Sequence, residues 1–144
     1  MKHGISAVDA AALVHSLRGA TLPRAQWTHA AHLVAGVWHV QQGGLAGAER
    51  EMPAVIRRYN ECSGVPNTTT SGYHETLTLA YLREIARQLS TLPPSVEFVT
   101  AVRAVLTSDL LDSNWPHRFW SRSRLWSLEA RQVWVDPDLA PLLR

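Results

Sequence analysis

The fold is organised around the stretch Asn67-Thr68-Thr69-Thr70-Ser71-Gly72-Tyr73-His74-Glu75-Thr76, a polar segment that leads directly into a strongly apolar helical pattern. At about 100° per residue, the helix expected over residues 71–90 has one broad apolar face made of Leu77, Tyr81, Leu82, Ile85 and Leu89. His74, Glu75 and Thr78 fall on or beside this face. Burial of such polar groups is costly unless each is paired. The sequence therefore predicts a polar site where this helix enters the core.

Apolar periodicity and helix-stop residues predict four more helices, which are expected over about residues 6–19, 27–42, 45–62 and 95–108. Gly43-Gly44 is expected to end the helix over residues 27–42. Pro53 requires that the helix over residues 45–62 either kinks at this proline or begins only near Met52. A short helix is expected after Ser127, and an extended tail from Asp136 onward.

The pattern contains no strand pair, internal repeat or domain linker. The predicted fold class is therefore all-α, with a single domain over residues 1–144. We expect a four- to five-helix bundle that carries an aromatic C-terminal flap.

Composition fits one globular core, since 46% of the 144 residues are hydrophobic and 18% are charged. A net charge of +2 is too small to indicate nucleic acid or an anionic membrane as a partner. Cys62 is the only cysteine, which excludes an intramolecular disulfide. The sequence shows neither a signal segment nor an apolar run of membrane-spanning length, so a cytoplasmic location is expected.

Histidines form a narrow stripe on the otherwise apolar helix over residues 27–42. His29, His32, Gly36 and His39 lie within about 80° of one another on the helical wheel. His29 and His32 are three residues apart and close enough to share a divalent ion such as zinc, iron, manganese or nickel. The third metal ligand is predicted to come from the facing helix, as His74 in a three-histidine set or as Glu75 in a set of two histidines and a carboxylate. His74 and the adjacent Glu75 are also the candidate catalytic residues, with Glu75 as a general base.

A metal-free pocket for a small-molecule ligand is the alternative. His74 near the positive end of a helix dipole favours the neutral form and suits proton acceptance, whereas Glu75 is stabilised as an anion. The candidate ligand-binding residues around this pair are Tyr59, Asn60, Asn67, Tyr73 and Arg122. No Gly-Lys-Ser/Thr phosphate loop is present, so no nucleotide cofactor is expected.

Two further functions depend on the aromatic and arginine-rich segment over residues 115–126. Exposed tryptophans at Trp115, Trp120 and Trp126 would anchor a homodimer or another protein interface. Stacking aromatics and arginines also suit nucleic acid, but one basic segment without a basic domain makes nucleic acid an unlikely partner. Tryptophans that pack the flap onto the bundle are the simpler interpretation of this segment.

Several short motifs of the chain resemble those of a group of uncharacterised short bacterial proteins. The motifs are Trp27-Thr28-His29-Ala30-Ala31-His32-Leu33, Tyr59-Asn60, Gly72-Tyr73-His74-Glu75-Thr76, Ser121-Arg122-Ser123-Arg124-Leu125 and Glu129-Ala130-Arg131. The resemblance covers residues from about 23 to the end and implies a self-contained cytoplasmic protein without a named reaction. The architecture is also similar to the DinB-like bundles, which bind metal through three histidines from different helices. Their pair of histidines four residues apart on a late helix is missing here.

Overall fold

The computed structural model describes residues 5–142 and contains only helices, turns and loops over this range. The α-helices are α1 (Ala7–Arg18), α2 (His29–Cys62), α3 (Glu75–Leu89), α4 (Phe98–Leu106), α5 (Arg122–Leu125) and α6 (Leu128–Gln132). Short 3-10 turns are η1 (Arg24–Gln26), η2 (Asp109–Leu111) and η3 (Trp115–Arg118). The expected all-α bundle is confirmed. The single domain was predicted over residues 1–144, of which residues 1–4 and 143–144 lie outside the described range.

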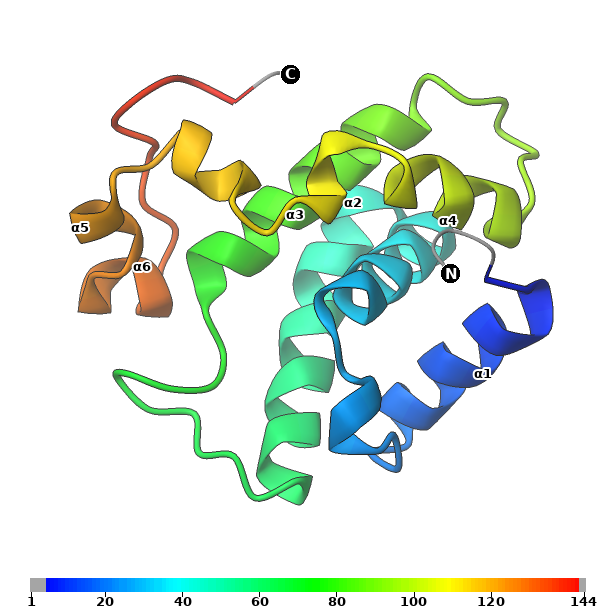
Figure 1. Ribbon diagram of the computed structural model, residues 1–144, viewed down its shortest axis with the longest axis horizontal. Helices are drawn as coiled ribbons and strands as arrows, with labels where there is room; N and C mark the ends of the chain where they lie inside the picture. Colours follow the sequence, from blue (N-terminus) through cyan, green and yellow to red (C-terminus); the bar gives the residue numbers. More distant parts are fainter. Residues whose placement is uncertain (1–4, 143–144) are drawn as a thin grey trace.

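Helix α2 runs through the middle of the molecule and packs against α1, α3 and α4 (Figure 1). Its first half is buried on nearly every side because apolar residues cover almost its whole circumference. Gly44 has φ 69° and ψ −176° and breaks the helix where the glycine pair predicted an end. The helical path then continues to Cys62 with Pro53 inside it, so the alternative of a start near Met52 is wrong.

Helix α3 begins four residues later than the pattern predicted. Gly72 has φ 83°, and a Cβ built there would lie 2.6 Å from the carbonyl oxygen of Pro66 and from Oδ1 of Asn67. This left-handed position cannot belong to a helix, so residues 63–74 form a loop and the helix starts at Glu75. Helix α4 also starts later than predicted, at Phe98, because residues 94 and 95 form a turn.

Close packing of α2 on α3 depends on Gly36. A Cβ at this position would lie 2.6 Å from Cδ1 of Ile85, which is almost fully buried. The missing side chain is thus replaced by the isoleucine of the facing helix. The space that Gly36 leaves on the histidine stripe is therefore largely taken up by Ile85.

The C-terminal flap, defined here as residues 114–142, folds across the N-terminal end of α3 (Figure 1). Trp120 is fully buried, and its Nε1–H donates to the carbonyl oxygen of Val135 over 3.0 Å. The hydroxyl of Thr76 donates to the carbonyl of Val133 and accepts from the N–H of Val135, at 2.9 and 3.2 Å. The short helix expected after Ser127 is confirmed as α6.

Two of the three tryptophans considered as interface anchors belong to the core. Trp115 and Trp120 are at most 4% exposed, whereas Trp126 is 49% exposed. The packing interpretation of the aromatic segment therefore holds for the first two residues. Between residues 5 and 142, no helix combines the length and apolar character needed to cross a membrane.

Candidate functional site

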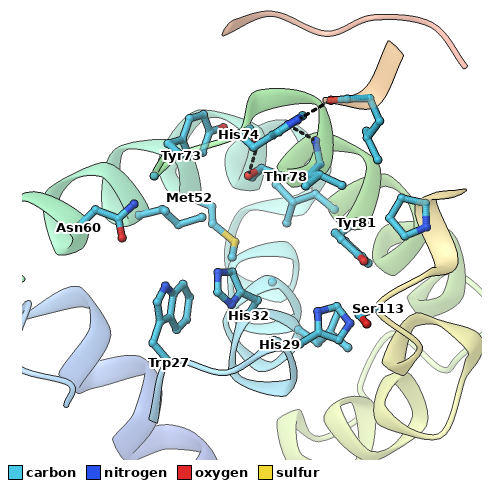
Figure 2. A pocket seen from close by; sticks show the side chains of 18 of the residues that line it. Trp27, His29, His32, Met52, Asn60, Tyr73, His74, Thr78, Tyr81 and Ser113 are labelled. Atoms are coloured by element: carbon cyan, nitrogen blue, oxygen red, sulfur yellow. Dashed lines mark hydrogen bonds between the residues drawn. The ribbon is translucent and has the colours of Figure 1, made fainter. Parts of the chain in front are cut away.

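A cavity of about 570 Å³ lies between α2, α3, the loop that precedes α3 and the C-terminal flap, and both halves of α2 contribute to its wall. Figure 2 shows side chains that line it, and those labelled come from α2, from α3 and from the residues just before each helix, together with Ser113, which precedes the flap. Apolar side chains make most of the remaining wall, namely Leu33, Met52, Ile56, Val65, Leu77, Leu82, Ile85 and Leu125. Four histidines line the same space: His29, His32, His74 and His117. The cavity therefore combines an apolar interior with several imidazoles.

Carboxylates are absent from the wall of this cavity, as far as residues 5–142 describe it. Arg24 is the one formally charged side chain among the described lining residues, and it is solvent-exposed at the end of the cavity near Trp27. Polar atoms come instead from neutral groups, including Asn60, Thr78 and Tyr81. A site of this composition suits an uncharged ligand better than a strongly charged one.

His32 projects from α2 beside Trp27, and the two rings stack with centroids 3.6 Å apart (Figure 2). Its Nδ1–H donates to the carbonyl oxygen of Thr28 over 2.8 Å. The pKa of His32 is lowered to about 4, chiefly because burial desolvates the ring, with smaller contributions from the nearby His29 and Arg24. At neutral pH His32 is therefore uncharged, with the lone pair on Nε2.

His29 lies one helical turn before His32, beside Tyr81 and Ser113 in Figure 2. Its Nε2–H donates to the carbonyl oxygen of Leu110 over 2.7 Å, which ties the start of α2 to η2. The ring also meets Tyr81 edge to face, with centroids 5.3 Å apart. In its neutral form, His29 keeps its lone pair on Nδ1.

His74 has both of its ring nitrogens engaged. As the N-cap of α3, its Nδ1 accepts the N–H of Leu77 over 3.2 Å. Its Nε2–H donates to the carbonyl oxygen of Leu125 in the flap over 2.8 Å. Burial is the main cause that lowers the pKa of His74, so both contacts belong to the neutral ring. No ring nitrogen remains for a metal or a substrate while these contacts persist.

The predicted metal set of His29, His32 and His74 is therefore not assembled. Among the described residues, no three His, Cys, Asp or Glu side chains are grouped in a way that could hold a metal ion. His29 and His32 each keep one free nitrogen, but His74 offers none.

Glu75 and Tyr73 interact with each other. The Tyr73 hydroxyl donates to Oε1 of Glu75 over 2.6 Å, and burial together with this carboxylate raises the pKa of Tyr73. Tyr73 lines the cavity and Glu75 does not. The structure therefore separates the two predicted catalytic residues, since His74 faces the cavity and Glu75 lies beside Tyr73.

The other predicted ligand-binding residues have mostly structural contacts. Tyr59 is fully buried and donates to the carbonyl of Leu22 over 2.7 Å. Asn67 accepts from Asn60 Nδ2 and from the N–H of Tyr73, both at 3.0 Å, and so shapes the loop before α3. Asn60 reaches the cavity, but Asn67 does not. Arg122 is exposed on α5, also outside the cavity.

His39 does not belong to this site, although it shares the histidine stripe of α2. Its side chain is only 2% exposed, so His39 does not mark an exposed strip of α2. Its Nδ1–H donates to the carbonyl of Ala35, and its Nε2 accepts from Nη1 of Arg18 over 3.0 Å. His39 is thus a satisfied core histidine whose pKa is lowered, chiefly by burial.

Several cavity residues were not identified from the sequence as site residues. Trp27 and Tyr81 were recognised only as helix-start and core positions, and His117 and Trp126 only as part of the flap. Nδ1 of His117 is buried without a hydrogen-bond partner among the described residues. The side chains that the flap contributes could not be selected from the sequence, because the path of the flap across α3 depends on contacts between residues distant in sequence.

The fold and the site define a small all-helical bundle with a ligand-sized cavity lined by imidazole and aromatic rings. No protein-family model matches the chain, and no curated protein or solved structure is significantly similar to it. The resemblances to short bacterial proteins and to the DinB-like bundles therefore stay predictions.

Replacement of His74 tests its structural role. We expect His74→Ala to lower the free energy of unfolding by about 2–3 kcal/mol, because it removes the α3 cap and leaves the Leu125 carbonyl unpaired. His74→Asn should cost about half as much, because asparagine is a good N-cap but is too short to reach Leu125. Urea unfolding followed by circular dichroism measures both values. As a control, exposed His15→Ala should change the value by less than about 0.5 kcal/mol. Equal losses for the Ala and Asn variants would contradict the capping role.

Proposed function

We propose that this protein binds a small, largely apolar molecule in the cavity between α2, α3 and the C-terminal flap. The observation that carries the proposal is the cavity itself, with its volume of about 570 Å³ and its mainly apolar wall. Ligand pockets typically have volumes of roughly 300–1,000 Å³ and a few placed polar groups. The neutral His32, the amide of Asn60 and the hydroxyl of Thr78 are such groups.

Trp126 indicates where a ligand would enter the cavity. Its side chain is 49% exposed and also lines the cavity, so it contacts both solvent and the interior of the site. The same ring meets His74 edge to face, with centroids 5.3 Å apart. A ligand that enters beside Trp126 would replace water on apolar surface, which is the main driving force of such binding.

Naphthalene is a suitable probe because it is apolar, uncharged and smaller than the cavity. We expect wild-type protein to bind it, and Leu77→Trp to weaken binding at least tenfold, because Leu77 lines the cavity and the larger side chain would fill part of it. Val8→Trp is the matched control, since Val8 is 77% exposed on α1 and does not line the cavity. Isothermal titration calorimetry gives the affinities, and thermal unfolding shows whether each variant is folded.

Equal affinity of wild type and Leu77→Trp would contradict the proposed location of the site. Failure of the wild-type protein to bind naphthalene would contradict the proposed binding of largely apolar molecules.

Divalent metal binding is a second candidate, favoured by the free nitrogens of His29 and His32 on one turn of α2. His74 could join as third ligand only after it releases Leu77 or Leu125. If the metal site exists, purified protein analysed by mass spectrometry should carry near-stoichiometric zinc, iron, manganese or nickel. The His29→Ala/His32→Ala double variant should lose it. Equal metal content in the two proteins would contradict this site.

A further inference from the structure

The tautomers of two cavity histidines are determined by backbone carbonyl groups. A carbonyl oxygen can only accept, so the nitrogen that contacts it must carry the proton. His32 therefore has its proton on Nδ1, which contacts Thr28, and His29 has its proton on Nε2, which contacts Leu110. The remaining nitrogens, Nε2 of His32 and Nδ1 of His29, are hydrogen-bond acceptors when the rings are neutral.

Neither acceptor has a hydrogen-bond partner within residues 5–142, although both rings line the cavity. Burial keeps the pKa of His32 near 4, so its Nε2 stays an acceptor throughout the neutral range. Trp27 covers one face of the His32 ring and holds its plane in place. The cavity thus presents two lone pairs of electrons to a ligand. One is on Nε2 of His32, whose ring is held in place, and the other is on Nδ1 of His29, one turn earlier on α2.

The charges around these acceptors narrow the class of ligand. An anion would bring its own lone pairs toward those of the two imidazoles, which is repulsive. An ammonium ion could donate to them, but no carboxylate among the described lining residues would compensate its charge, and Arg24 would oppose it. An uncharged N–H or O–H group satisfies the acceptors without either cost.

Aromatic rings surround the same space. Trp27, Tyr81 and Trp126 line the cavity together with the imidazoles, and flat apolar surfaces favour a flat apolar ligand through stacked and edge-to-face contacts. We propose that the ligand is an uncharged aromatic molecule whose hydroxyl or ring N–H donates to Nε2 of His32, with Nδ1 of His29 as the neighbouring acceptor. This inference rests on the proposed function and adds the chemical class of the ligand.

A matched pair of probes tests the inference. The compounds 2-naphthol and 2-methoxynaphthalene share the ring system, but only naphthol can donate a hydrogen bond. We expect wild-type protein to bind naphthol about fivefold more tightly, which corresponds to one ordinary hydrogen bond. His32→Phe should abolish this preference while it keeps the aromatic stack on Trp27. His15→Phe, on the exposed face of α1, should leave the preference unchanged.

The outcomes separate this inference from the proposed function. Equal affinity of wild type for the two naphthalenes, or tighter binding of 2-naphthoate, would overturn the donor assignment and leave the cavity as a binding site. A naphthol preference that survives in His32→Phe would overturn the role of His32. Absence of binding for both compounds and for naphthalene itself would overturn the proposed function together with the inference.

Discussion

The two hydrogen bonds of the His74 ring hold together the region on which the candidate site depends. One caps α3, and the other reaches the carbonyl of Leu125 in the C-terminal flap, 51 residues further along the chain. Thr76, two residues later, makes a second link to the flap through Val133 and Val135. Without these contacts the flap would lack its main polar attachment to α3, and the cavity would lose the wall that Leu125 and Trp126 provide.

Four histidines that are buried or partly buried in the bundle share one arrangement. His29, His32, His39 and His74 each donate one ring N–H to a backbone carbonyl, with nitrogen–oxygen distances between 2.7 and 2.8 Å. They differ in what the second nitrogen meets. In His39 and His74 it accepts from a protein donor, whereas in His29 and His32 it is free among the described residues. The hydrogen bonds to the second nitrogens of His39 and His74 contribute to the fold. The free second nitrogens of His29 and His32 are the hydrogen-bond acceptors of the candidate site.

Periodicity was sufficient to predict most of the helices. The circumferential apolar pattern of residues 30–40 predicted a central helix, and α2 occupies that position. The helix start predicted at residue 71 was wrong because Gly72 adopts a left-handed conformation that depends on Asn67 and Pro66.

Site residues were harder to predict. Helical spacing placed His29 and His32 together. Which ring nitrogen donates and which accepts depends on nearby carbonyl groups, and only the folded chain brings a carbonyl such as that of Leu110 to His29. His117 and Trp126 join the cavity through the flap, whose path no local pattern specifies.

The proposed function depends most directly on His32 as a neutral hydrogen-bond acceptor in the cavity. Long-range ¹H–¹⁵N correlation spectra of the histidine side chains measure the protonation state and tautomer of each ring directly. At pH 5.5 we expect a neutral His32 with its proton on Nδ1, because its pKa is about 4 and the carbonyl of Thr28 accepts a hydrogen bond from that nitrogen. A charged His32 ring at this pH, or a neutral ring protonated on Nε2, would contradict this assignment.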